Sequence, residues 1–291
     1  MPHNKNKKNV RIIPRDIRIL QSVAENQFLT TSQISALHFP SIHRARKRLR
    51  ILAQHDFLKR TRLLQGFDNL SAEAIYYIGR RGMQLLTAHG ELSDMMPIPR
   101  LTLRPGSFMF LSHTLMRNSF RIALEGSLML NPNVSLHDWK HDNSITQRVL
   151  IPNPKTLSLE RIPLRADAHF QLKKNKRITE FYLEVDNGTM PLTRLISKLE
   201  AYQVWERMHI KGNNVSQPQI RILVLMFSEK RVKNLIQRLR KCGSGNFGGS
   251  VCLIASCERD KLLAIQIVEK PLWFQLTPQG INRTSLSNEI G

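Results

Sequence analysis

The sequence predicts a protein of mixed α and β structure in two parts: a small N-terminal domain of helices and one hairpin, and a larger α/β domain. Three observations predict this. The chain has 291 residues, a length that suits two modest domains or one large one. Hydrophobic residues make up 41% of it, enough to bury a core. Prolines interrupt every periodic pattern between residues 91 and 106, which predicts a linker there between domains at 11–90 and 107–291.

The N-terminal domain begins with three helices. Pro14 suits the start of the first helix, and apolar residues recur on one face behind it. Thr30 and Gln33 have the spacing of a capping box that begins a short second helix, which Pro40 ends. Ser41 would cap the third helix. The apolar residues of this third helix fall on one stripe: Ile42, Ala45, Leu49 and Leu52.

Two strands, at 58–64 and 74–78, and a helix at 81–88 complete the domain. Three helices with a two-stranded wing follow the plan of a winged helix-turn-helix, whose recognition helix fits the major groove of DNA. Basic side chains cover the polar surface of the third helix, although such a run also occurs on ordinary solvated helices. The expected DNA contacts are Arg44, Arg46, Lys47, Arg48 and Arg50 on the helix, and Arg60 and Arg62 on the wing.

The net charge indicates a polyanionic partner. Lysine and arginine total 44 and aspartate and glutamate 22, which gives a formal charge of +22. Such an excess favours nucleic acid or an anionic membrane surface. The longest apolar run, residues 222–227, is far too short to span a membrane. Double-stranded DNA is therefore the expected partner and a membrane is not. A basic arm at residues 1–10, with Lys5, Lys7 and Lys8, would track phosphates or stay disordered.

The cellular compartment is indicated by two features. The N-terminus carries charge but no apolar segment of the kind found in secretory signals. The chain has three cysteines, Cys242, Cys252 and Cys257. They are too few for a disulfide framework, and their spacing lacks the close pairs of a structural zinc site. A reducing cytoplasm is expected, with the three thiols as ordinary core residues.

The larger domain alternates helices and strands, a pattern that lets helices cover both faces of a sheet. A glycine-rich stretch at residues 243–249 lacks the Gly-Lys-Ser/Thr sequence of a phosphate-binding loop, so a flexible turn is expected there. The expected helices lie at 107–130, 192–208 and 230–241, and the expected strands at 134–140, 164–172, 178–186, 220–227 and 251–256.

Two of these strands bring carboxylates together. Both alternate with period two around a polar turn at 173–177. If the hairpin turns about Asn175 and Lys176, apolar residues face apolar residues, and Asp167 lies opposite Glu184. Carboxylates that face each other at about 5 Å destabilise a sheet unless something compensates. Because Mg²⁺ prefers carboxylate oxygens, we expect a metal site here, with a solvent-exposed acidic face as the alternative. Asp186 would pair with Arg165.

An aspartate, a glutamate on the next strand and a following helix resemble the core of the PD-(D/E)XK nuclease superfamily. The resemblance implies a restriction-endonuclease-like core with the element order αβββαβ, in which Asp167 and Glu184 hold Mg²⁺. In that superfamily a lysine two residues after the glutamate activates or orients the attacking water. That position is Asp186 here. Some members place the lysine on the next helix, where Lys198 lies; the alternative is an ordinary surface lysine.

The order of motifs over residues 12–230 is similar to the replication-relaxation family of plasmid and mobile-element proteins. A winged helix is followed by Arg-Ala-Asp-Ala, Glu-Val-Asp-Asn-Gly-Thr and the segment from Lys198 to Tyr202, with Trp139 after a helix led by His113.

The family resemblance implies a bacterial DNA nuclease or nickase that acts in plasmid replication or DNA relaxation. It would hydrolyse phosphodiesters with Mg²⁺ at Asp167, Glu184 and Lys198. The alternative is a non-catalytic replication accessory or transcriptional regulator with an inactive nuclease-like fold. A homodimer would suit an operator-type DNA site.

Overall fold

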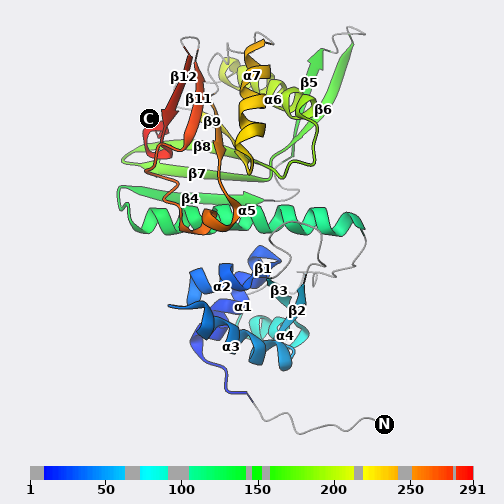
Figure 1. Ribbon diagram of the computed structural model, residues 1–291, viewed down its shortest axis with the longest axis vertical. Coiled ribbons are helices and arrows are strands. Elements are labelled where there is room, and N and C mark those ends of the chain that lie inside the picture. Colours follow the sequence, from blue (N-terminus) through cyan, green and yellow to red (C-terminus); the bar gives the residue numbers. More distant parts are fainter. Residues whose placement is uncertain are drawn as a thin grey trace. The chain divides into compact units, whose positions relative to one another are not determined.

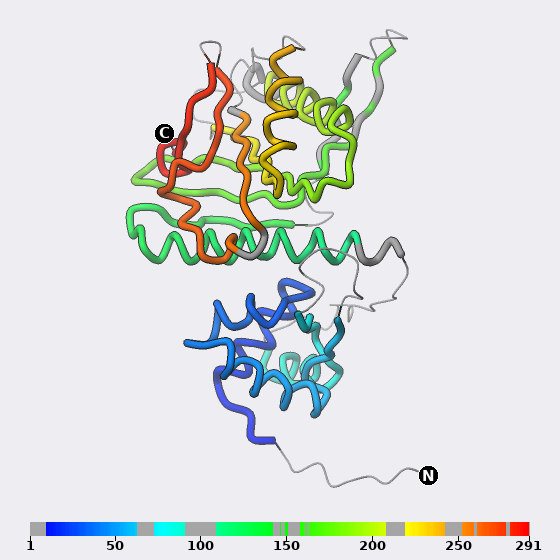
Figure 2. Tube along the Cα trace, in the orientation of Figure 1, coloured from blue at the N-terminus to red at the C-terminus, as the bar shows by residue number. Residues whose placement is uncertain are grey.

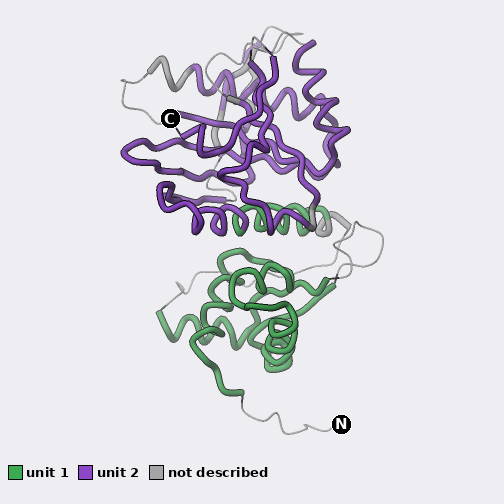
Figure 3. Tube along the Cα trace, turned by 60° about the vertical axis from the view of Figure 1, so that its left-hand side comes forward, with its two compact units in different colours: residues 1–122 green, residues 123–291 purple. Residues whose placement is uncertain are grey.

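The computed structural model describes residues 10–62, 73–90, 105–141, 146–152, 158–212, 219–241, 251–277 and 280–290. The chain forms two compact units, Met1–Ile122 and Ala123–Gly291 (Figure 3). The expected fold class of mixed α and β structure is confirmed. Most of the basic arm, most of the expected linker and the glycine-rich stretch lie outside the described residues. Within the described ranges, no helix is long and apolar enough to cross a membrane.

The described residues of the first unit up to residue 90 form four helices and a three-stranded antiparallel sheet with the strand order β1-β3-β2 (Figure 1). The sequence predicted each of these elements except the two-residue strand β1. The elements are α1 (Pro14–Asn26), β1 (Leu29–Thr30), α2 (Thr31–His38), α3 (Ile42–Gln54), β2 (Leu58–Arg62), β3 (Ala74–Ile78) and α4 (Arg80–Ala88).

The helix starts of the first unit confirm one capping prediction and correct another. The Thr30 hydroxyl accepts a hydrogen bond from the Gln33 amide at 3.2 Å, and the Gln33 side chain accepts one from the Thr30 amide at 2.8 Å. Ser41 stands at the N-cap of α3, but its side chain makes no capping hydrogen bond. Ala45 and the two leucines of the α3 stripe are fully buried, whereas Ile42 is 36% exposed because the stripe turns toward solvent at the first residue of the helix.

Helix α5 (Pro105–Met129) follows, and the division between the units falls inside it, after the expected linker. The reason is that side chains of the first unit bind the first half of α5. The Gln33 side chain donates to the Leu115 carbonyl at 2.7 Å, and the Asn118 side chain of α5 donates through Nδ2 to the carbonyls of Asn26 and Phe28 at 2.9 and 2.8 Å.

The second unit is built on a seven-stranded mixed sheet with the order β12-β11-β10-β9-β8-β7-β4 and a separate two-stranded sheet, β5-β6. Strands β8, β9 and β10 are parallel neighbours, and the others pair antiparallel. Its elements are β4 (Val134–His141), β5 (Thr146–Pro152), β6 (Leu159–Arg165), β7 (Ala168–Lys174), β8 (Arg177–Asp186), α6 (Leu192–Gly212), β9 (Gln219–Met226), α7 (Glu229–Lys241), β10 (Val251–Ser256), a 3-10 helix (Arg259–Ala264), β11 (Trp273–Thr277), β12 (Gly280–Thr284) and α8 (Leu286–Glu289).

Helices α6 and α7 are the crossovers between the parallel strands, as helices in such sheets usually are. Their apolar residues share one buried cluster with side chains from β8, β9 and β10. Leu195 and Leu199 of α6 and Leu235 of α7 belong to it and are at most 2% exposed. This packing holds α6 against the end of β8 that carries the acidic residues.

The predicted register of β7 and β8 is confirmed, because Ala168 pairs with Leu183 and Phe170 with Phe181. The turn contains Asn175 at a positive φ of 56°. The predicted single strand at 164–172 is wrong, since it divides into β6 and β7 at Ala166 and Asp167. At this break the side chain of Asp167 accepts a hydrogen bond from the Val185 amide of the neighbouring strand.

The division has a second consequence. Arg165 lies at the end of β6 opposite Thr146, so the predicted pair between Arg165 and Asp186 is wrong. Two antiparallel strand pairs were not predicted from the sequence: β5-β6 and β11-β12, which Figure 2 traces in green and red.

Candidate functional site

The second unit contains a cluster of four polar side chains, here called the carboxylate cluster: Asp167, Glu184, Lys198 and Tyr202. The Lys198 ammonium donates to Glu184 Oε2 at 2.5 Å, and the Tyr202 hydroxyl donates to Glu184 Oε1 at 2.6 Å. Lys198 also donates to the Arg165 carbonyl at 2.7 Å. Glu184 is 4% exposed and Tyr202 2% exposed. The three predicted catalytic residues therefore lie together, with Tyr202 as a fourth member.

Each member is placed by the local fold. Glu184 is near the end of β8, where the alternation of the strand turns it toward α6. Lys198 and Tyr202 are four residues apart on α6, and such residues are neighbours on one helix face. Leu195 and Leu199 are buried on the same helix and hold it against the sheet.

Asp167 lies beside Glu184 through two hydrogen bonds to the strand that carries it. The Asp167 amide donates to the Leu183 carbonyl at 2.9 Å, and Asp167 Oδ2 accepts from the Val185 amide at 2.7 Å. Leu183 and Val185 flank Glu184 in β8. The carboxylate of Asp167 is thereby held next to that of Glu184, as the predicted pairing requires, although Asp167 lies just before the first residue of β7.

The electrostatics of the cluster are governed by burial. Burial, together with the nearby charge of Asp167, raises the pKa of Glu184, while Lys198 and Tyr202 act in the opposite direction, and the net result is a pKa of about 7. Burial and the adjacent Glu184 carboxylate raise the pKa of Tyr202 well above its ordinary value, so its hydroxyl remains a donor. Burial also raises the pKa of the neighbouring Cys252 thiol to about 12.

The cluster fits a divalent cation in its donor chemistry. Two adjacent carboxylates, one of them with a pKa raised by burial and by its neighbour, are stabilised in the ionised form by a bound cation. Within the ranges that the structure describes, no group of three or more histidine, cysteine, aspartate or glutamate side chains could hold a metal. The protein side chains available to a cation here are Asp167 and Glu184.

Asp186, which stands where the nuclease pattern has lysine, makes an ion pair with α7. Its carboxylate accepts from Arg231 at 2.5 and 3.1 Å, and Arg231 also donates to the Met190 carbonyl. Asp186 is 7% exposed. This pair connects the end of β8 to the start of α7, and it explains why Asp186 does not need Arg165.

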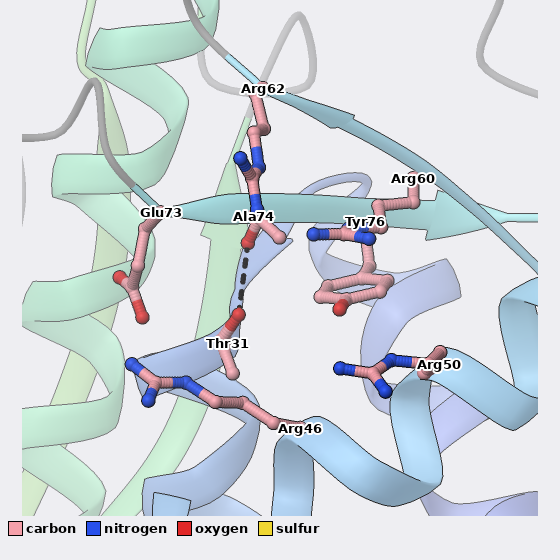
Figure 4. Close-up of a pocket in the computed structure, with 8 residues that line it drawn as sticks. All are labelled: Thr31, Arg46, Arg50, Arg60, Arg62, Glu73, Ala74 and Tyr76. Atoms are coloured by element: carbon pink, nitrogen blue, oxygen red, sulfur yellow. Dashed lines mark hydrogen bonds between the residues drawn. The ribbon is translucent and has the colours of Figure 1, made fainter.

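The predicted DNA contacts fall into three groups. Four converge on a pocket of about 200 Å³ in the first unit (Figure 4): Arg46, Arg50, Arg60 and Arg62. Arg44 and Lys47 are exposed on α3 and do not line this pocket. Arg48 has a different environment, because its guanidinium donates to both oxygens of the fully buried Asp16 and to the Arg11 carbonyl.

Tyr202 and Arg231 were not predicted from the sequence to have a role in the site. A signal for Tyr202 exists in the sequence, because it lies four residues after Lys198 and shares its helix face. Arg231 has no such signal, since it is 45 residues from Asp186 and meets it only through the crossover of α6, β9 and α7.

Comparison with known proteins identifies the family. The model of the replication-relaxation family matches residues 20–216, more than half of the chain, and the chain belongs to this family. No curated protein matches it.

Two solved structures are similar at a low level. Restriction endonuclease FokI has a TM-score of 0.32 and 10% identity over 88% of this chain and 45% of that chain. The structure of FokI bound to DNA has a TM-score of 0.27 and 9% identity over 87% and 44%. The chain spans less than half the length of these structures, and a likeness at this level gives no information on activity.

Proposed function

We propose that this replication-relaxation protein binds double-stranded DNA through its first unit and hydrolyses a phosphodiester bond, with a divalent cation, at the carboxylate cluster of its second unit. The observation that carries the proposal is the meeting of Lys198 with Glu184 beside Asp167. A buried acid, an adjacent acid and a lysine are the groups that metal-assisted phosphodiester hydrolysis needs. The nicking of one strand would relax supercoiled DNA.

The roles of the residues follow from their contacts. Asp167 and Glu184 would hold Mg²⁺, which when bound supplies a Lewis acid and lowers the pKa of a water molecule. Lys198 brings a positive charge to the Glu184 carboxylate, where it would orient the attacking water or stabilise negative charge on the phosphate. Tyr202 fixes the orientation of Glu184 from the buried side.

The first unit supports DNA binding by its order of elements and its charge. Helices α2 and α3 followed by the β2-β3 hairpin suit a winged helix, with α3 in the major groove. Arg44 and Lys47 are exposed on α3. Together with the four arginines of the pocket they would neutralise phosphates and make the affinity strongly dependent on salt.

A second function is favoured by one observation. Both oxygens of Glu184 already accept hydrogen bonds, one from Lys198 and one from Tyr202. A cation that binds Glu184 would have to compete with these donors. If the donors prevail, the cluster is a buried structural ion pair, and the protein is a non-catalytic DNA-binding replication factor or regulator.

A supercoiled-plasmid assay separates the two functions. The wild type is incubated with plasmid in Mg²⁺ or in EDTA, beside Glu184→Gln and Lys198→Ala. Glu200→Gln is the matched control, because it removes the same charge from a partly exposed position on α6 outside the cluster. We expect open circles from the wild type and the control in Mg²⁺ only. Plasmid binding without conversion, at any Mg²⁺ or Mn²⁺ concentration, would establish the non-catalytic function.

A further inference from the structure

The pocket between α3 and the β2-β3 hairpin of the first unit, here called the arginine pocket, has features of a ligand site. Its volume is about 200 Å³. Arg46 and Arg50 reach into it from α3, and Arg60 and Arg62 from β2 (Figure 4). The remaining lining residues are Thr31, Glu73, Ala74 and Tyr76.

Two periodicities bring the four arginines together. Arg46 and Arg50 are four residues apart and therefore lie on one side of α3. Arg60 and Arg62 alternate on β2 and pair with Tyr76 and Ala74 of β3, so all four of these residues lie on one face of the sheet. This face turns toward Arg46 and Arg50, as the shared lining of the pocket requires.

The four guanidinium groups are only partly compensated by charge among the described residues, because Glu73 is the single acidic residue of the pocket lining. No hydrogen bond or ion pair joins any of the four to another side chain or to the backbone within the described ranges. The carboxylate of Glu73 also lines the pocket, but its Oε1 accepts from the Ser32 amide at 2.7 Å and the Ser32 hydroxyl at 2.6 Å. Four like charges against one carboxylate repel one another, and an anion in the pocket would relieve the repulsion.

Tyr76, another residue of the pocket lining, adds a neutral donor. Tyr76 is 3% exposed, and burial raises its pKa despite the opposing charges of Arg60, Arg50 and Arg62. Its hydroxyl therefore stays protonated beside the arginines. Guanidinium groups match the oxygens of a phosphate in charge and geometry.

We propose that the arginine pocket binds a single backbone phosphate of DNA and so fixes the position of the duplex against α3 and the wing. This inference rests on the proposed function of the first unit and specifies the contact it uses. The pocket is smaller than the roughly 300–1,000 Å³ of sites that enclose small organic ligands. The exposed Arg44 and Lys47 extend the positive surface of α3 beyond the pocket, which suits a polymer of phosphates better than a lone anion.

The salt dependence of DNA binding tests the number of phosphates. The slope of log K against log salt is negative, and it becomes shallower by about 0.9 for each phosphate contact that is lost. We expect the double variant Arg50→Ala/Arg60→Ala and the variant with all four arginines replaced to show the same change, about 0.9. If each of the four arginines contacted its own phosphate, the slope of the fourfold variant would instead become shallower by roughly 3.6. At moderate salt the double variant is expected to bind about ten-fold more weakly or worse, as for lost charge-assisted hydrogen bonds.

Lys59→Ala is the matched control. Lys59 adjoins Arg60 on the same strand, carries the same charge and lies on the opposite face of the sheet, where it pairs with Asp56 at 2.7 Å. It is expected to leave the slope within error of the wild type. Arg60→Lys, which keeps the charge but loses the planar fork, is expected to bind between the wild type and Arg60→Ala.

The same variants separate DNA from a free anion. Pyrophosphate is expected to raise the unfolding temperature of the wild type but not of the fourfold variant, whose folding is verified by circular dichroism. Stabilisation by pyrophosphate with an unchanged DNA slope in the fourfold variant would overturn the assignment to DNA. If the fourfold variant keeps the DNA slope of the wild type and pyrophosphate does not stabilise the wild type, the arginine pocket is not an anion site. Neither result bears on plasmid nicking, so failure of the pocket and failure of the nuclease function remain distinguishable.

Discussion

The arginine pocket of the first unit and the carboxylate cluster of the second treat charge in opposite ways. In the cluster, Glu184 is buried and both of its oxygens are hydrogen-bonded by donors of the protein itself. In the pocket, four guanidinium groups have no partner among the described residues. The buried charge of the cluster is therefore part of the folded structure, whereas the unpartnered charges of the pocket are the basis of the proposed phosphate site.

One helix contains the same contrast within three residues. Arg48 of α3 pairs with the fully buried Asp16 of α1, and Arg50 lines the arginine pocket. Both residues were predicted to contact DNA, since the sequence shows only a run of basic residues. The direction of each side chain around the helix decides which one stabilises the fold.

The largest effect on stability is expected from Arg48→Ala. It leaves the carboxylate of Asp16 buried without its guanidinium partner, and we expect a loss of about 3 kcal/mol in the free energy of unfolding. Urea denaturation of the first unit measures this. Arg44→Ala, an exposed arginine on the same helix, is the control for loss of charge. Equal stability of the two variants would refute the contrast between paired and unpaired arginines.

A smaller loss is expected from Tyr202→Phe. It removes the donor on Glu184 Oε1 at nearly constant volume, and a hydrogen bond to a charged group contributes about 2 kcal/mol. Loss of the donor also raises the pKa of Glu184 further, because the bond stabilises the ionised form. Urea denaturation at pH 8 gives the first quantity, and the titration of Glu184 by NMR gives the second. A pKa that falls would contradict the hydrogen bond to the carboxylate.

The first unit is expected to lose stability in acid through His38. Burial and the charges of Arg18 and Arg15 lower its pKa from 6.5 to about 4. Between these pH values the unfolded chain binds a proton that the folded chain does not, so stability falls as the pH falls from about 6.5 to about 4.

Unfolding of the wild type and His38→Gln at pH 7.5 and pH 5 measures the contribution of His38. The variant is expected to lose less stability between the two pH values than the wild type. His43→Gln, an exposed histidine on α3, is the control and is expected to follow the wild type. If the free energy of unfolding of the wild type and of His38→Gln changed equally with pH, the lowered pKa of His38 would be contradicted.

The smallest effect on stability is expected from Arg50→Ala. The side chain has no partner to lose among the described residues, and relief of repulsion in the arginine pocket offsets lost packing. We expect the free energy of unfolding to change by no more than about 0.5 kcal/mol, and to increase in low salt. Thermal unfolding at low and high salt measures it. A loss as large as that of Arg48→Ala would show that Arg50 has a structural partner.

The sequence predicted what periodicity controls. The alternation around Asn175 predicted the register of β7 and β8, and with it the approach of Asp167 and Glu184. Helical spacing placed Lys198 beside Tyr202. The sequence could not predict that Asp186 pairs with Arg231, because that contact depends on how α7 packs after a crossover. The arginine pocket has the same limit, since the periodicities of α3 and β2 bring the four arginines together only when the β2-β3 hairpin packs beside α3.

DNA binding and plasmid nicking, measured on the same two variants, decide whether the two units divide binding and cleavage between them. Arg50→Ala/Arg60→Ala is predicted to bind plasmid more weakly but to nick it at the wild-type rate when protein is in excess. Lys198→Ala is predicted to bind plasmid as the wild type does and to leave it supercoiled. Loss of nicking in the first variant under saturating protein, or retention of nicking in the second, would contradict the division of binding and cleavage between the two units.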